Sequence, residues 1–329
     1  MENPIRRTLV LRLPDLLRLI AVGLTLSLVA APAGADTSTA PATSPFSPAP
    51  KPVESFDVGT LHVDQFGSGK QSLILIPGLS CGPWVWHGTI AKFGPKYSIY
   101  VLTLPGFSGH PATKETPLFT TSKRDFWEML ATRKIEKPLV VGHSLGGMLA
   151  IALAAEHPDR LCAIVAADGL PVFPTLAKLS AKARKGIADD IAKQMIASSD
   201  AETLANQKMY MSTTGTNRPE LADAAATLVA RSDPKAVAAW MHELIVADLR
   251  PDLAGITIPF LEIMPYQPPV AGQSPAYTQE QTLAFYKSLI AGAPKATVTA
   301  ITPSRHFVML DQPEAFYEMI GKFFAAVPR

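Results

Sequence analysis

One serine stands in a setting that would make its hydroxyl a nucleophile. Ser144 is the centre of Gly142-His143-Ser144-Leu145-Gly146, with the apolar run PLVV before it and LGGMLAIALAAEH after it. A strand that turns sharply into a helix strains the central residue and leaves room only for glycine on either side. The hydroxyl then stands at the positive end of the helix dipole. The pattern therefore predicts a nucleophilic Ser144 rather than a glycine-rich packing turn.

Four segments give the chain its resemblance to a known family. They are GHSLGG, LILIPGLSCGPWVW, LTLPGFSGHP and SRHFVMLDQPEAF, and they resemble the α/β-hydrolase family over essentially everything after residue 52. In that family the general base comes from the last segment, which selects His306. A serine hydroxyl attacks only when a neighbouring base takes up its proton. The other histidines are interpreted as structural, and His143 is expected to point away from the nucleophile.

The acid that would orient the imidazole departs from the commonest family pattern. That acid usually follows the strand expected at 260–263, but this stretch reads FLEIMPYQPP and contains no Asp. Asp168 directly follows an earlier strand-like run, where some members of the family place their acid, and the chain order nucleophile, acid, base fits as well. We therefore predict Asp168, although an Asp-Gly turn is the structural alternative. Glu262 is expected not to face the site, and Asp248 and Asp252 are expected at the opposite edge of the sheet.

Two backbone N–H groups are expected to form an oxyanion hole for the charge that develops on the attacked carbonyl. One is that of Leu145, directly after the nucleophile. By the family resemblance the second comes from the loop PGLSCG, where alignment on Gly78 selects Leu79. The family often has His before this glycine and the chain has Pro77, which leaves the Leu79 N–H in place.

Short apolar runs alternate with helical stretches along the chain, and they predict the strands and helices that must position these groups. Continuous apolar runs suit strands that are buried on both faces of a parallel sheet. Strands are predicted at 60–66, 72–76, 98–102, 139–141, 163–167, 260–263 and 296–301. Helices are predicted at 85–93, 121–135, 144–157, 279–291 and 313–325. The alternation predicts an α/β protein with a mostly parallel, doubly wound sheet, which with the resemblance is an α/β-hydrolase fold.

One long stretch breaks the alternation. Residues 171–247 contain helix formers and no strand-like run, and they are far longer than a simple helical crossover requires. We interpret them as a helical cap inserted into a core made of residues 52–170 and 248–329.

The first 35 residues have the pattern of a secretory signal peptide. A basic region is followed by the apolar run 19–31 and by Ala33-Gly34-Ala35, an A-x-A cleavage site. The apolar run is shorter than the ~20 residues of a membrane-spanning helix. Residues 36–51 are rich in Ala, Thr, Ser and Pro and are interpreted as a flexible linker. The mature protein is therefore expected to be exported, to the periplasm or outside the cell, without a stable membrane anchor.

Composition narrows the range of partners. The chain has 30 basic and 28 acidic residues, and without residues 1–35 it has 26 of each. A neutral body offers no electrostatic reason to expect nucleic acid or anionic lipid as a partner. Cys81 and Cys162 are expected at opposite sheet edges, as two buried thiols rather than a disulfide. No Cys/His cluster has zinc spacing, so no metal or cofactor is expected.

These features together predict a serine hydrolase that cleaves a small or medium, largely apolar ester through an acyl-enzyme on Ser144. The cap is rich in Ala, Leu, Met and Val and offers little to bind a charged substrate. The same fold and triad would also serve amide, lactone or carbon–carbon bond hydrolysis. A binding module that kept the fold without activity is the alternative of a different class. Only a small-molecule substrate is expected as a partner, and the oligomeric state is left open.

Overall fold

The computed structural model describes residues 46, 48–269 and 277–327. The predicted signal peptide and most of the predicted linker lie outside the described residues. Among the helices that are described, none is both long and apolar enough to cross a membrane.

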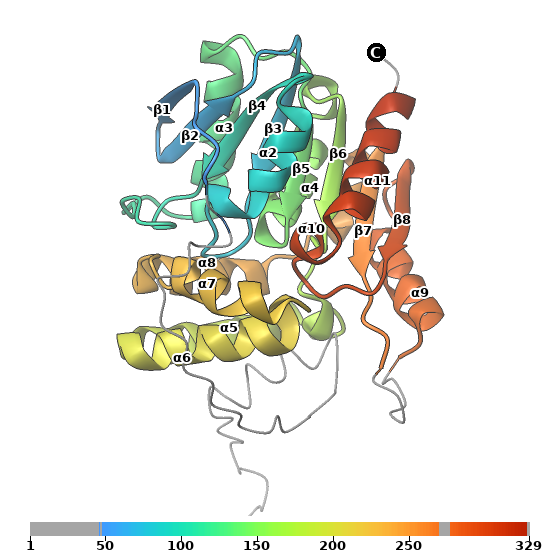
Figure 1. Ribbon diagram of the computed structural model, residues 1–329. Helices are drawn as coiled ribbons and strands as arrows, with labels where there is room; N and C mark the ends of the chain where they lie inside the picture. Colours follow the sequence, from blue (N-terminus) through green and yellow to red (C-terminus); the bar gives the residue numbers. More distant parts are fainter. Residues whose placement is uncertain (1–45, 47, 270–276, 328–329) are drawn as a thin grey trace, which may run out of the picture.

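A single sheet of eight strands forms the centre of the molecule, with the order β1-β2-β4-β3-β5-β6-β7-β8 (Figure 1). All neighbouring pairs from β4 to β8 are parallel, and β1 and β2 join them antiparallel. The strands are β1 (Glu54–Val58), β2 (Leu61–Phe66), β3 (Gln71–Ile76), β4 (Tyr97–Thr103), β5 (Leu139–His143), β6 (Ala163–Ala167), β7 (Phe260–Pro265) and β8 (Ala296–Ile301). The fold class and each predicted strand are confirmed.

Strand β1 was not predicted from the sequence. Its residues, ESFDV, contain only two apolar side chains and are exposed or half-buried. The strand lies at the edge of the sheet and forms a hairpin with β2, so it needs no buried face. Hydrophobic periodicity therefore carries no signal for it.

Helices cover both faces of the sheet (Figure 1). One layer holds α2 (His87–Phe93), α10 (Val308–Asp311) and α11 (Pro313–Ala326), and the other holds α3 (Leu118–Thr132), α4 (Leu145–Glu156) and α9 (Gln279–Ile290). Helix α4 is apolar all round because it is packed between the sheet and neighbouring helices. This buried helix fixes the end of β5, where Ser144 lies.

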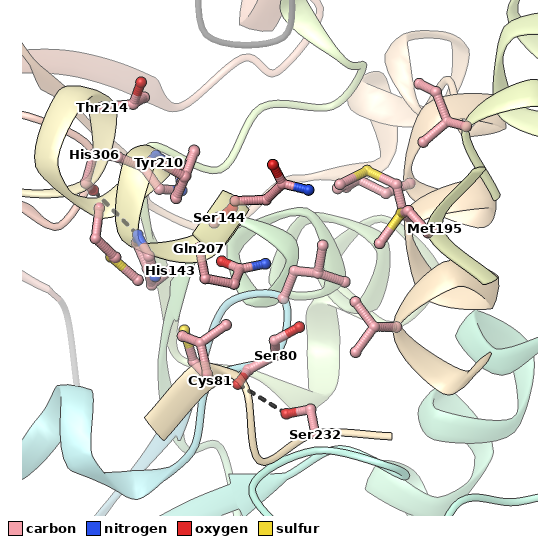
Figure 2. Close-up of a pocket in the computed structure, with 18 of the residues that line it drawn as sticks. Ser80, Cys81, His143, Ser144, Met195, Gln207, Tyr210, Thr214, Ser232 and His306 are labelled. Atoms are coloured by element: carbon pink, nitrogen blue, oxygen red, sulfur yellow. Dashed lines mark hydrogen bonds between the residues drawn. The ribbon is translucent and has the colours of Figure 1, made fainter. Parts of the chain in front are cut away.

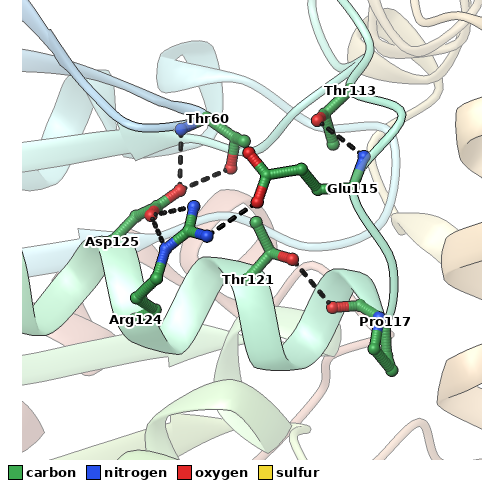
Figure 3. Close-up of polar contacts among 7 residues, drawn as sticks. All are labelled: Thr60, Thr113, Glu115, Pro117, Thr121, Arg124 and Asp125. Atoms are coloured by element: carbon green, nitrogen blue, oxygen red, sulfur yellow. Dashed lines mark hydrogen bonds and ion pairs between the residues drawn. The ribbon is translucent and has the colours of Figure 1, made fainter.

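A buried carboxylate ties the edge strands to α3 (Figure 3). Asp125 is fully buried and accepts hydrogen bonds from the Thr60 N–H and hydroxyl, both at 2.7 Å. Arg124 donates to the same carboxylate from Nε at 2.7 Å and pairs with Glu115 at 2.6 Å. A side chain at Gly59, whose φ is +55°, would collide with Asp125. The tight turn between β1 and β2 is thus held against α3.

Four helices lie between β6 and β7 and across one end of the sheet (Figure 1). They are α5 (Ala181–Ala197), α6 (Asp200–Tyr210), α7 (Pro219–Val229) and α8 (Pro234–Val246), and we call them the cap helices. A π-helical turn, η4 (Met211–Gly215), joins α6 to the segment before α7. The described chain forms no strand here, only an isolated bridge between Val172 and Asp248.

Polar contacts fasten the cap helices to the core. Glu243 of α8 accepts hydrogen bonds from the Leu118 and Phe119 N–H groups at 2.7 and 2.8 Å. These groups begin α3 and have no acceptor within their own helix, so Glu243 caps that helix. Ser232, just before α8, donates from its hydroxyl to the Ser80 carbonyl at 3.0 Å. Ser80 belongs to the loop that carries Leu79.

Candidate active site

The turn between β5 and α4 holds Ser144 in a strained backbone conformation. Its φ is 53° and its ψ is −118°, a region that residues other than glycine seldom adopt. A Cβ at Gly142 would collide with the Gly146 carbonyl, and one at Gly146 would collide with the Ile76 carbonyl. The glycines on both sides of Ser144 are therefore required by space, and the serine projects from the end of the central strand.

His306 and Asp168 meet at this same end of the sheet. His306 Nδ1 lies 2.5 Å from Asp168 Oδ2, and the exposed fractions of the two side chains are 14% and 3%. Asp168 directly follows β6, with a φ of 51°, and His306 follows β8. A proton on Nδ1 would be donated to the carboxylate and would leave Nε2 as the proton acceptor. The geometry is that of a general base oriented by a buried acid.

All three predicted triad residues line one cavity of about 210 Å³. Figure 2 shows Ser144 and His306 in it. The hydrogen bonds of His306 go to Asp168, His143 and Thr214. A bond between Ser144 and His306 is not formed among the described residues, and catalytic hydrogen bonds often tighten only when substrate is bound.

The structure places the two predicted oxyanion-hole residues beside Ser144. Leu145 is the first residue of α4, so its N–H has no acceptor within the helix. Leu79 lies in a tight turn that is closed by a 3.0 Å hydrogen bond from the Cys81 N–H to the Gly78 carbonyl. A Cβ at Gly78 would stand 3.2 Å from the Ser144 Cβ. Both segments therefore border the place where an attacked carbonyl would lie.

Tyr286 and Glu262, which were not predicted to belong to the site, lie beside Asp168 and the residue after it. The Tyr286 hydroxyl donates a hydrogen bond to Asp168 Oδ1, the oxygen that His306 leaves unoccupied. Glu262 Oε1 accepts from the Gly169 N–H at 3.3 Å. Burial, with the charge of Asp168 as a second cause, raises the pKa of Glu262 well above its ordinary value and keeps it neutral. Glu262 lines no part of the cavity, as expected, but it supports the loop that carries the acid.

His143 was expected to point away from the nucleophile and to be structural, but its ring lies against His306 and lines the same cavity. His143 is fully buried, lines the cavity, and has its ring centroid 4.6 Å from that of His306. Its Nε2 lies 3.1 Å from the His306 carbonyl oxygen. Burial lowers its pKa well below the ordinary value, so the ring is neutral. The loop after β8 crosses the end of β5, which places the two histidines in contact.

The predicted position of Asp248 is also wrong. It pairs with Val172 just beyond the end of β6, on the side of the sheet where Asp168 lies. Its carboxylate accepts hydrogen bonds from Arg250 and lies 3.2 Å from the buried Arg184 of α5. The chain reaches β7 only after a further turn, η5 (Arg250–Gly255), which the sequence pattern does not separate from α8. Asp248 therefore anchors a cap helix.

The two cysteines are not joined by a disulfide, as expected. Cys81 is buried beside the cavity, where burial raises the pKa of its thiol. Cys162 is half-buried rather than fully buried.

The cap is bonded directly to the loop that carries the candidate base. The His306 N–H donates to the Thr214 carbonyl in the π-helical turn at 3.1 Å, and the next N–H donates to the following carbonyl at 2.9 Å. Arg305 Nη1 donates to the Ser212 and Thr216 carbonyls at 2.6 and 3.0 Å. π-Helical turns occur frequently at functional sites. The position of His306 thus depends on the cap as well as on β8.

The cavity has no cationic wall. Neither Lys nor Arg is among the described residues that line it. Within the described chain, no group of three or more His, Cys, Asp or Glu residues is placed to hold a metal ion.

Residues 73–319 match the model of the alpha/beta hydrolase family. The chain belongs to the alpha/beta hydrolase family. It is a hydrolase on this fold. Two solved structures share the architecture, the enol-lactonase from Burkholderia xenovorans (TM-score 0.63, 20% identity) and a thermophilic esterase from Thermogutta terrifontis (TM-score 0.63, 17% identity). Each alignment covers 83% of this chain, with 100% and 98% of the respective neighbours.

Two relatives of this hydrolase carry the same name. The chain is 25% identical over 268 residues to the pimeloyl-[acyl-carrier protein] methyl ester esterase of Aeromonas hydrophila, with 80% of this chain and 99% of the relative covered. It is 23% identical over 264 residues to the protein of the same name from Yersinia enterocolitica, with 78% and 94% covered.

Proposed function

We propose that this hydrolase cleaves carboxylic esters through an acyl-enzyme on Ser144. The observation that carries the proposal is the pair formed by His306 and the buried Asp168, with 2.5 Å between Nδ1 and Oδ2, in the same cavity as the strained Ser144. The methyl ester esterases among the relatives support ester chemistry in particular.

In the proposed mechanism, Ser144 Oγ attacks the ester carbonyl while His306 Nε2 takes up its proton. The Leu79 and Leu145 N–H groups bind the oxyanion of the tetrahedral intermediate. His306 then donates the proton to the leaving alkoxide, and the acyl group remains on the serine. Water repeats the sequence, with His306 as base again, and releases the carboxylic acid. Asp168 keeps the imidazole in the productive tautomer and stabilises the imidazolium.

The cavity supports an uncharged acyl or alcohol portion of small or medium size. Helices α5 and α8 line it with aliphatic and thioether side chains, which favour apolar groups through the hydrophobic effect. No Lys or Arg of the described chain reaches the cavity wall to bind a free carboxylate or phosphate.

Replacement of the nucleophile tests the proposal. Ser144→Ala should fold normally and lose on the order of 10⁶-fold in turnover of nitrophenyl esters, by analogy with other triad knockouts. Thermal unfolding of the variant controls for folding. Substantial turnover by a folded Ser144→Ala protein would refute the serine mechanism.

A further inference from the structure

One cap helix lines the cavity differently from its neighbours. The residues of α5 and α8 that reach the cavity are all apolar, for example Met195 and Met241. Those of α6 are all polar: they are Thr203, Asn206, Gln207 and Tyr210. Their spacing of three, four and seven residues places them on one face of the helix. We call these four residues the α6 polar stripe.

The stripe begins next to the candidate base and leads away from it. The ring of Tyr210 lies with its centroid 6.2 Å from that of His306. Figure 2 shows Tyr210 and Gln207 on the same side of the cavity. With a rise of 1.5 Å per residue, Gln207 and Asn206 lie about 4.5 and 6 Å further along the helix, and Thr203 about 10.5 Å further.

The side chains of the stripe make no hydrogen bond to other residues in the described part of the chain, although each is half-buried. By contrast, Ser232 of the cap, which is more deeply buried and lines the same cavity, donates its hydroxyl to the Ser80 carbonyl. Amide groups at a cavity wall lose water when an apolar chain covers them, and this loss is costly unless the ligand replaces the hydrogen bonds. The stripe therefore disfavours a plain alkyl chain.

We infer that the α6 polar stripe recognises a second, uncharged hydrogen-bonding group of the substrate, such as a distal ester or amide carbonyl, about one helical turn from the scissile ester. This inference rests on the proposed ester hydrolysis and narrows its substrate class. The distal group is uncharged because no Lys or Arg of the described chain lines the cavity, and an unpaired carboxylate is costly to bury. The side-chain amides of Asn206 and Gln207 both donate and accept, which suits a carbonyl or a hydroxyl group.

Hydrolysis of three matched substrate series tests the inference. The series are the dimethyl esters of straight-chain diacids from succinate to suberate, the methyl alkanoates of equal length, and the monomethyl diacid anions. In the wild type, kcat/KM for the best diester should exceed that for its matched alkanoate by about tenfold, the effect of about one hydrogen bond. It should exceed that for the monomethyl anion by at least ~100-fold.

Two variants test whether the α6 polar stripe causes the preference for diesters over alkanoates. Asn206→Leu and Gln207→Leu should each bring the diester-to-alkanoate ratio of kcat/KM toward one. Gln279→Leu makes the same change at an exposed position of α9 and should leave the ratio as in the wild type. Labelling of Ser144 by a fluorophosphonate shows that each variant still assembles the site.

The outcomes separate the inference from the proposed function. A ratio near one in the wild type, a ratio that neither variant changes, or fast hydrolysis of the anions would overturn the inference while the esterase proposal stands. Absence of all ester hydrolysis with Ser144 unlabelled would overturn both.

Discussion

His306 Nδ1 lies 2.5 Å from Asp168 Oδ2, although 138 residues of chain separate them. Parallel strands make this possible, because β6 and β8 both end at the edge of the sheet where β5 presents Ser144. The second carboxylate oxygen of Asp168 accepts from Tyr286. Asp168 is thus held from two sides, as the proposed orientation of the imidazole requires.

The first prediction concerns the choice of acid. Asp168→Asn should keep the local shape but favour the wrong tautomer of His306, and turnover of a nitrophenyl ester should fall by up to about 10⁴-fold. Asp252→Asn, at an exposed position in η5, is the matched control and should leave turnover unchanged. Near-full activity of Asp168→Asn would show that another group orients the base.

The second prediction concerns the contact between the cap and the base. Arg305 Nη1 links the Ser212 and Thr216 carbonyls around the turn that binds the His306 N–H. The lysine side chain is one bond shorter than that of arginine, so its ammonium group does not reach the position of Nη1. Arg305→Lys should lower kcat by about 10- to 100-fold through misplacement of His306. Arg231→Lys, at an exposed position of the cap, is the control. Equal kcat values for the two variants would mean that the turn does not position the base.

The third prediction concerns stability and pH. Because the pKa of Glu262 is raised in the folded state, folding retains a proton that the unfolded chain releases above about pH 4.5. The free energy of unfolding should therefore fall as pH rises from there toward the folded-state pKa. Glu262→Gln keeps an acceptor for the Gly169 N–H but cannot ionise, so this part of the decline should disappear. Urea titrations of the wild type and of Glu262→Gln from pH 5 to about 8 measure the free energy of unfolding of each protein. Parallel declines in the two proteins would refute a buried, neutral Glu262.

The sequence was sufficient to predict the features that depend only on residues close together in the chain. The elbow around Ser144 is fixed by neighbouring glycines, and each buried strand is marked by a continuous apolar run. Tyr286 and the π-helical turn were not predicted, because their roles arise only when α9 and the cap pack against loops that are distant in the chain. The contact of His143 with His306 was not predicted and Asp248 was placed wrongly, for the same reason. Their positions depend on how the loop after β8 and the segment before β7 cross the end of the sheet.

The fourth prediction concerns export. Residues 33–35 form an A-x-A site after a short apolar run, so the mature chain should begin at Asp36. Cell fractionation and intact-mass measurement after expression in a bacterial host check this. Full-length protein with residues 1–35 in the exported fraction would contradict cleavage, and confinement of all the protein to the cytoplasm would contradict export.

The most direct test of the central claim is to trap the covalent intermediate. Wild-type protein mixed with a slowly deacylating nitrophenyl ester and quenched in acid should gain the mass of one acyl group, and peptide mapping should place that group on Ser144. Ser144→Ala should gain no such mass under the same conditions. An acyl group on another residue, or rapid ester hydrolysis by Ser144→Ala, would contradict an acyl-enzyme on Ser144.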